Sequence, residues 1–288
     1  MRVLITGGDG QLGRALHDLL IGEASVDAPD VDRLDVTDAD AVGAYFAGHR
    51  PNVVYHAAAW TDVDGCERDP DRAFLVNEKG AAIVAAASAA RRARLVAVST
   101  DFVFDGRKGE PYVEADEPTP VSAYGRSKRA GERAVLEAYP EAAVVRTAWL
   151  FGEGGTGNFV TAILAAADHG RPLRVVDDQI GSPTYAVDLG AALVRLARRK
   201  GEGIFHGVNA GEASRYDFAR AILDLSGRRG VAIEAIKSDD VDRPAQRPAR
   251  STLGGKRLAE AGVPSMRPWR AALEEYLVRI GERSDDDV

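Results

Sequence analysis

The chain of 288 residues has little cysteine, methionine or aromatic content: one cysteine, two methionines and 7% aromatic residues. The single cysteine, Cys66, excludes an internal disulfide and fits a reducing compartment. No apolar run approaches membrane-spanning length, and the chain opens on a short strand-like run rather than on a signal peptide. These features predict a cytoplasmic protein with no membrane partner.

Excess positive charge is also lacking. Thirty-seven Lys and Arg residues face 44 Asp and Glu residues, so the formal net charge is −7. This balance argues against nucleic acid as a partner, and an anionic substrate would need local positive charge. The five histidines show no metal-ligand spacing, and His56, at the end of a predicted strand, lacks a second ligand. No metal site is therefore predicted.

What the chain does have is a glycine-rich turn near its N-terminus. The apolar run 2–6 predicts a buried strand, and 11–20 has the apolar spacing of a helix. Two registers fit the turn between them: Gly7-x-x-Gly10-x-x-Gly13, which we favour because the strand ends just before Gly7, and Gly8-x-Gly10-x-x-Gly13. Strand, glycine turn and helix together predict a dinucleotide site. The alternative is that the turn is simply a glycine-rich turn in some other kind of α/β protein.

Short apolar runs alternate with longer helical patterns through the first half of the chain. Strands are predicted at 53–56, 95–99 and 143–146, and helices at 71–92 and 122–138. This order predicts an α/β fold: a doubly wound parallel Rossmann-like sheet in 1–150, with ligands beyond the C-terminal ends of its strands. Residues 151–288 are predicted to form a smaller C-terminal substrate-binding lobe, with segments within 174–208 returning to the sheet.

Tyr124 and Lys128 carry the second signal. Residues four apart share one face of a helix, and a nearby ammonium favours a phenolate, so the pKa of Tyr124 is expected to fall. Tyr124 would then be a general acid for a carbonyl undergoing reduction. Thr100 follows a predicted central strand, where its hydroxyl would hold the carbonyl oxygen. A solvated helix carrying an incidental tyrosine and lysine is the alternative.

With these residues in view, the chain resembles extended short-chain dehydrogenases/reductases, and more narrowly the dTDP-4-dehydrorhamnose reductase family. The matching segments are TGGDGQLG, LDVTD, AAAWTDVD, STDFVFDG, YGRSKRAGE, VRTAWLFG, NFV, RVVDDQIGSPTYAVDL and RPARSTL. The resemblance implies hydride transfer from NADPH or NADH to carbon 4 of dTDP-4-dehydro-β-L-rhamnose, a dTDP-sugar, with Thr100, Tyr124 and Lys128 as the catalytic residues.

The resemblance also implies two sets of binding residues. Cofactor-binding residues would be Gly7, Gly10, Gln11, Leu12, Gly13, Asp30, Asp35, Val36, Ala57, Ala58, Ala59, Tyr124 and Lys128. Substrate-binding residues would be Thr61, Val63, Thr100, Asp101, Phe102, Trp149, Asn158, Gln179 and Arg247. For Arg247, a surface guanidinium in a proline-rich loop is the alternative.

Three positions bear on the cofactor and on assembly. Asp30 lies about where the second strand should end and would favour NADH through the ribose, whereas the nearby Arg33 would receive the 2′-phosphate of NADPH. The cofactor is therefore NADPH or NADH, with NADPH slightly favoured by resemblance. Ala15 stands where some family members have a glutamate linked to a magnesium-bound dimer, which weakens the case both for that metal and for that dimer. A homodimer is left open.

Other functions remain as alternatives. A 4-ketoreductase for another dTDP-deoxysugar would share nearly all of these motifs. A dehydratase or epimerase on the same scaffold is a further alternative. Sugar-nucleotide dehydratases typically have a second carboxylate after the position of Asp101, where this chain has Phe102, a position at which the family often has tyrosine, and this argues against dehydration. A non-catalytic nucleotide-binding subunit, like the regulatory subunit of methionine adenosyltransferase, would not need the intact catalytic set.

Overall fold

A six-stranded parallel sheet forms the centre of the protein in the computed structural model, which describes residues 1–170 and 172–283. Its order is β10-β5-β4-β3-β1-β2. The strands are β1 (Arg2–Thr6), β2 (Ser25–Asp27), β3 (Val53–His56), β4 (Arg94–Thr100), β5 (Ala143–Thr147) and β10 (Gly203–His206). The chain runs from β1 to β2 in one direction and from β3 outward in the other, so a crevice opens where the order reverses. This arrangement confirms the predicted doubly wound parallel sheet.

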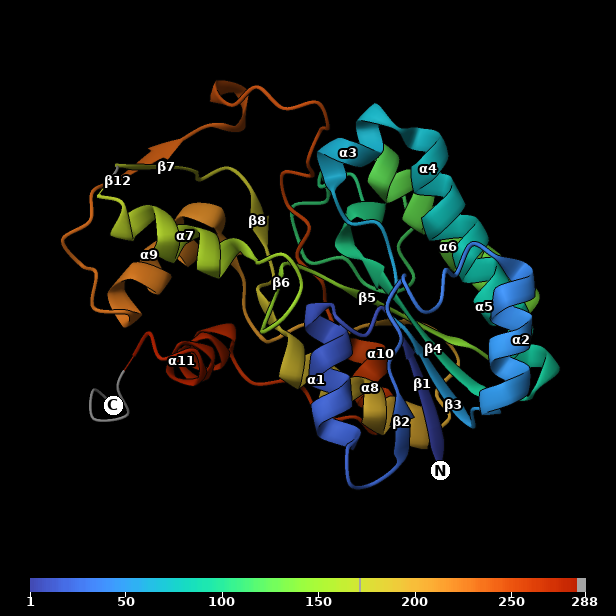
Figure 1. The fold of residues 1–288 in the computed structure, drawn as a ribbon. Coiled ribbons are helices and arrows are strands. Elements are labelled where there is room, and N and C mark those ends of the chain that lie inside the picture. Colours follow the sequence, from blue (N-terminus) through green and yellow to red (C-terminus); the bar gives the residue numbers. More distant parts are fainter. Residues whose placement is uncertain (171, 284–288) are drawn as a thin grey trace.

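Helices cover both faces of the sheet (Figure 1). On one face lie α1 (Gln11–Leu20), α8 (Ala186–Arg198) and α10 (Lys256–Glu260), which share a buried core with the strands. On the other face lie α2 (Ala39–His49), α5 (Ala81–Ala90) and α6 (Ala123–Ala138), with a second core. The central strands β3 and β5 are covered on both faces and buried along their whole length, which explains their apolar runs.

The stretch 70–90 is continuous helix with an irregular centre, where the sequence predicted one helix over 71–92. It consists of α4 (Pro70–Phe74), a π-helical segment (Leu75–Gly80) and α5. By length and composition this stretch is apolar enough to cross a membrane. In the fold it packs against α6 and the sheet, and Ala73 and Val84 are fully buried there. It is therefore a core helix of the α/β layer.

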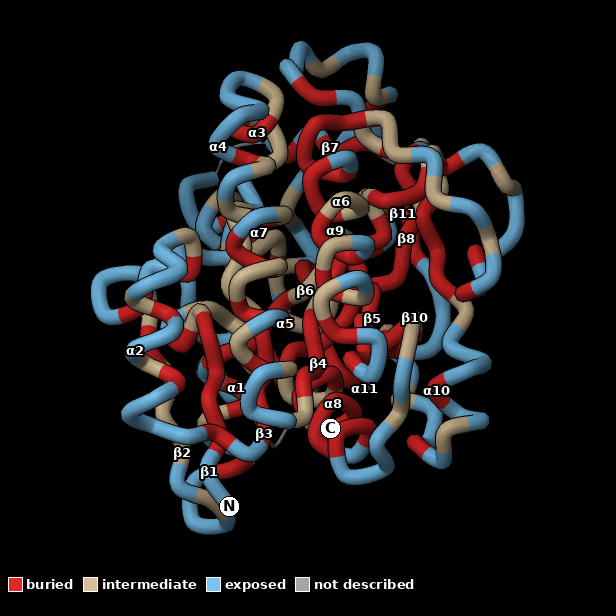
Figure 2. The backbone as a smooth tube through the Cα atoms, turned by 90° about the vertical axis from the view of Figure 1, so that its right-hand side faces the viewer, coloured by how far each residue is buried: buried red, intermediate tan, exposed pale blue. Residues whose placement is uncertain are grey.

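The C-terminal lobe is built from three helices and three pairs of short strands. The helices are α7 (Phe159–Asp168), α9 (Arg215–Leu225) and α11 (Trp269–Arg279). The pairs are β6 (Leu150–Phe151) with β9 (Thr184–Tyr185), β7 (Leu173–Val176) with β12 (Ile233–Ile236), and β8 (Ile180–Gly181) with β11 (Ala213–Ser214). Buried residues continue from the sheet into this lobe (Figure 2). Three short helices complete the described chain: α3 (Val63–Arg68), η2 (Asp101–Val103) and η3 (Ser238–Asp240).

One local prediction is wrong, and two short strands have no sequence signal. Strands β8 and β9 pair with segments more than 30 residues away in sequence, so no local pattern marks them. The second strand of the sheet ends at Asp27, before the predicted Asp30. The chain turns there because Pro29 presents its carbonyl to the glycine turn, accepting from the backbone N–H groups of Gly7 and Gly8 at 3.1 Å each.

Candidate active site

The glycine turn after β1 is shaped by close backbone approach. Gly7 has φ of +72°, and a Cβ atom there would lie 2.9 Å from the backbone nitrogen of Ala58. A Cβ atom on Gly13 would lie 2.2 Å from the carbonyl oxygen of Gly7. Helix α1 begins after Gly10 with no side-chain cap. Its free N–H groups and positive dipole end fit an anionic pyrophosphate.

Asn77 fixes the segment that faces this turn, and sequence reasoning missed it. Its side-chain oxygen accepts from the N–H of Trp60 at 2.8 Å, and its amide donates to the carbonyl of Trp60 and to the hydroxyl of Ser127, each at 3.0 Å. Gly131 of α6 allows the close approach of this segment, because a Cβ there would lie 2.1 Å from the Asn77 carbonyl. Asn77 thereby ties the segment after β3, including Ala57, Ala58 and Ala59, to the helix that carries Tyr124.

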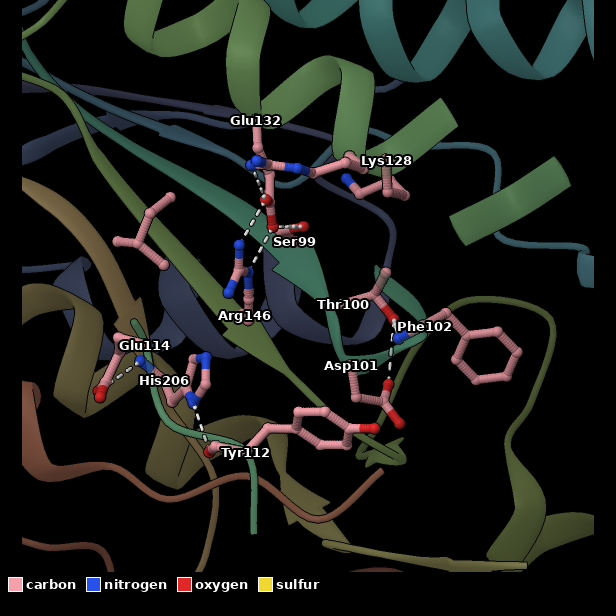
Figure 3. Close-up of polar contacts among 12 residues, drawn as sticks. Ser99, Thr100, Asp101, Phe102, Tyr112, Glu114, Lys128, Glu132, Arg146 and His206 are labelled. Carbon is pink, nitrogen blue, oxygen red and sulfur yellow. Dashed lines mark hydrogen bonds and ion pairs between the residues drawn. The ribbon is translucent and has the colours of Figure 1, made fainter. Parts of the chain in front are cut away.

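The predicted catalytic residues meet at the C-terminal end of β4. Thr100 ends the strand, while Tyr124 and Lys128 lie one turn apart on α6. All three are more than nine-tenths buried. The Thr100 hydroxyl is hydrogen-bonded to the Tyr124 phenol, and the Lys128 ammonium donates to the carbonyl of Val98 at 2.8 Å. Figure 3 shows Lys128 above the end of the strand, with Thr100 below it.

Burial dominates the electrostatics of this trio. It raises the pKa of Tyr124, which the hydrogen bond with Thr100 only partly offsets. The predicted lowering of the pKa of Tyr124 is therefore wrong for the chain alone: loss of solvent is the largest effect, and the charge of Asp101 also raises the pKa. Burial also lowers the pKa of Lys128 to about 8, against a smaller upward effect of Glu132.

The predicted sugar side of the site is apolar near the phenol and polar beyond it. Val63, Phe102 and Tyr124 pack in one cluster, with the Phe102 ring edge-on to Tyr124 at 5.5 Å between centroids. Thr61 is exposed at the rim. Asp101 is buried; its carboxylate accepts from the hydroxyls of Thr100 and Ser251. Burial raises the pKa of Asp101 to about 6, so it is mostly ionised at neutral pH.

Trp149 follows β5 with a strained backbone. Its φ is +46°, an outlier for a bulky residue. The ring lies against Gly181 of β8, where a Cβ atom would come within 2.3 Å of it. The strain and the missing side chain together place the indole between the end of the sheet and the C-terminal lobe.

The other predicted substrate residues are held by protein partners. The Asn158 amide donates to Gln11 at 3.2 Å, to the Gly152 carbonyl and to the Tyr276 hydroxyl, which joins the N-terminus of α1 to α11. Gln179 donates to the Ser238 hydroxyl at 2.9 Å. The Arg247 guanidinium makes a two-point ion pair with Asp64, both nitrogen–oxygen distances being 2.7 Å.

The predicted adenosine side flanks the glycine turn. Asp35 accepts from the N–H and the hydroxyl of Thr37, and Val36 is buried against Gly80. Arg33 donates to Asp27 at 3.0 Å and to the Tyr45 hydroxyl, so its charge is balanced within the protein. An open cleft of about 610 Å³ borders Arg33 and the turn.

No group of three or more His, Cys, Asp or Glu side chains could hold a metal ion within residues 1–170 and 172–283. The residues around the glycine turn fit a dinucleotide instead. Because glycines line the turn, the backbone can come close to a pyrophosphate, and the N-terminus of α1 has no side-chain cap that would block it.

Comparisons with known proteins agree on one family. Residues 1–281 match the model of the RmlD substrate binding domain. The dTDP-4-dehydrorhamnose reductase of Mycolicibacterium smegmatis is 42% identical over 97% of this chain and 86% of its own, and the dTDP-4-keto-6-deoxy-D-glucose reductase of Streptomyces niveus is 41% identical over 95% and 96%.

A solved structure is also similar over nearly the whole chain. The dTDP-4-dehydrorhamnose reductase of Bacillus anthracis, in complex with NADP, superposes with a TM-score of 0.94 at 36% identity, covering 96% of this chain and 99% of that one. The chain therefore belongs to the RmlD substrate binding domain family, the family of the dTDP-4-dehydrorhamnose reductases.

Proposed function

We propose that this protein is a cytoplasmic NAD(P)H-dependent reductase of the 4-keto group of dTDP-4-dehydro-β-L-rhamnose, giving dTDP-L-rhamnose. One observation carries the proposal: Thr100, Tyr124 and Lys128 meet at the end of β4, in a chain whose glycine turn fits a dinucleotide. Relatives more than 40% identical carry the name of this reaction or of a closely similar one.

Each of the three residues has a distinct role in the proposed reaction. The bound cofactor would supply the hydride. Thr100 and Tyr124 hold the carbonyl oxygen through their hydroxyls, and Tyr124 gives that oxygen its proton. Lys128 contributes positive charge beside the cofactor ribose and favours the phenolate that proton transfer leaves behind. Because burial raises the pKa of Tyr124, the phenol keeps its proton at neutral pH, which a proton donor requires.

The test is an assay of NADPH and NADH oxidation with dTDP-4-dehydro-β-L-rhamnose, followed by NMR of the sugar product. We expect oxidation dependent on the dTDP-sugar and a product with the rhamno configuration at carbon 4. Tight nucleotide binding without oxidation of either cofactor, across a panel of dTDP-4-keto sugars, would instead indicate a non-catalytic nucleotide-binding subunit.

A second candidate is the reduction of a different dTDP-4-keto-6-deoxysugar. The specific observation in its favour is that the Streptomyces niveus relative, named for dTDP-4-keto-6-deoxy-D-glucose, is 41% identical to this chain. The same assay separates the two candidates, because the preferred sugar has the higher kcat/KM and its product shows the stereochemistry at carbon 4.

The Lys128 ammonium predicts an alkaline limit to activity. Because burial lowers its pKa from the ordinary 10.5 to about 8, the charge is lost in the folded protein as pH rises through 8. We expect kcat/KM, which reports the free enzyme, to fall by about tenfold per pH unit above that point. Measurement of kcat/KM from pH 6 to 10 tests this, and a flat profile to pH 10 would contradict it.

Two further measurements separate Lys128 from other groups. Arginine stays protonated across this range, so Lys128→Arg should lower activity overall and remove the alkaline limb. Stability should move in the opposite direction. Between about pH 8 and 10.5 the unfolded chain binds the proton that folded Lys128 has lost, so its contribution to the free energy of unfolding rises with pH.

A further inference from the structure

Three arginines converge between the end of β4 and the start of α3. Asp64 of α3 accepts from the Ala245 N–H and from Arg247, which holds the segment of Arg243 and Arg247 at this position. Arg215 stacks on Trp149 and interacts electrostatically with Asp101, Arg243 and Arg247. The three arginines lie on segments far apart in sequence: Arg215 begins α9, and the other two belong to the proline-rich segment 242–248. In a protein of net charge −7, such a cluster is the local positive charge that an anionic substrate needs.

The three differ in how much of their charge the protein already uses. Arg247 is committed to its two-point pair with Asp64 and also donates to the Ala245 carbonyl. Within residues 1–170 and 172–283, no carboxylate lies within ion-pair distance of the guanidinium of Arg215 or of Arg243, and neither guanidinium has a hydrogen-bond partner. Those two are therefore available to a ligand.

Aromatic rings hold Arg215 in place, although its position at the start of a helix is unfavourable for a positive charge. Its guanidinium carbon lies 3.6 Å from the centroid of the Trp149 ring and 4.9 Å from that of Phe159. It occupies the first position of α9, where the helix dipole disfavours a cation. Its position is thus set by the strained Trp149 and by Gly181, whose lack of a Cβ admits the indole.

We propose that Arg215, stacked on Trp149, and Arg243 bind the diphosphate of the nucleoside-diphosphate substrate. This inference rests on the proposed function for the identity of the substrate. A guanidinium presents a planar fork of donors that matches two phosphate oxygens at once, and stacking keeps that fork oriented. The cofactor pyrophosphate has its own place at the glycine turn, so the arginine cluster accounts for the second diphosphate. Asp64 holds Arg247, and with it the segment 242–248, beside this position.

The test measures binding of dTDP, thymidine and NADPH by calorimetry in the whole protein. We expect Arg215→Met and Arg243→Met each to weaken dTDP binding by about 10- to 100-fold, the loss of one or two charged hydrogen bonds. Binding of thymidine, which has no phosphate, and of NADPH should stay within about twofold of wild type. Added salt should weaken dTDP binding less in the variants than in the wild type.

Controls separate this site from general charge and folding effects. Arg220→Met removes an arginine from the same helix, where it is partly exposed near Asp224 at 4.0 Å, and should leave dTDP binding unchanged. Arg215→Lys keeps the charge but loses the planar fork, so it should lie between wild type and Arg215→Met. Gly181→Ala displaces the indole without altering any charge and should also weaken dTDP binding.

The outcomes distinguish this inference from the proposed function. Wild-type affinity for dTDP in Arg215→Met, or an equal loss for thymidine, would overturn it even if the sugar is reduced normally. Arginine-dependent dTDP binding in a protein that reduces no dTDP-4-keto sugar would support the diphosphate site and contradict the proposed function instead.

Discussion

Replacing Tyr124 with phenylalanine is expected to lower kcat for sugar reduction by about 100- to 10,000-fold, the usual contribution of a positioned proton donor. Only the hydroxyl is lost. The ring would keep its place in the apolar cluster with Val63 and Phe102, edge-on to the Phe102 ring. The measurement is steady-state NADPH oxidation with saturating dTDP-4-dehydro-β-L-rhamnose.

The matched control is a tyrosine whose hydroxyl lies away from the site. Tyr112 is buried in a different cluster, with Val103 and Phe104, and its hydroxyl donates to Asp105 at 2.7 Å. Tyr112→Phe should change stability more than turnover, whereas Tyr124→Phe should leave NADPH affinity and the melting temperature near wild type. Near wild-type kcat in Tyr124→Phe would remove Tyr124 from its proposed role.

The sequence predicted the layers and the shared helix face of Tyr124 and Lys128 because both depend on short-range patterns. Unbroken apolar runs mark strands covered on both faces, and the spacing of Tyr124 and Lys128 is set by one turn of helix. The same reasoning misjudged the pKa of Tyr124, since it counted the charge four residues away and not the loss of solvent. Burial arises from tertiary packing, which single-sequence patterns do not contain.

The features of the site that the sequence did not predict depend on contacts between distant segments. Asn77 positions the segment after β3 from within a π-helical turn that packs closely on Gly131 of α6, an arrangement with no sequence signal. Arg247 was predicted from its motif, but its pairing with Asp64, 183 residues away, could not be. Arg215 was overlooked because it stands at the start of a helix, and only the fold places Trp149 beneath it.

Replacing Glu132 with alanine is expected to lower the free energy of unfolding by about 3–5 kcal/mol, because it leaves a buried charge without its partner. Glu132 and Arg146 are each at least 98% buried and form a two-point ion pair at 2.7 and 2.8 Å. The Ser99 hydroxyl also donates to Glu132 (Figure 3). One nitrogen of Arg146, Nη1, already lacks a hydrogen-bond partner within the described chain. Urea unfolding followed by circular dichroism measures the change.

Glu137→Ala is the matched control, because it removes the same side chain from the same helix at a site 74% exposed and 4.0 Å from Arg133. We expect it to change the free energy of unfolding by less than about 0.5 kcal/mol, as surface substitutions usually do. The double variant Glu132→Leu with Arg146→Met removes both charges and fills similar volume, so it should recover most of the loss. If the double variant were as unstable as Glu132→Ala, the cost would come from lost packing at α6. Recovery of stability would show that the loss in Glu132→Ala comes from the unpaired guanidinium of Arg146 on β5.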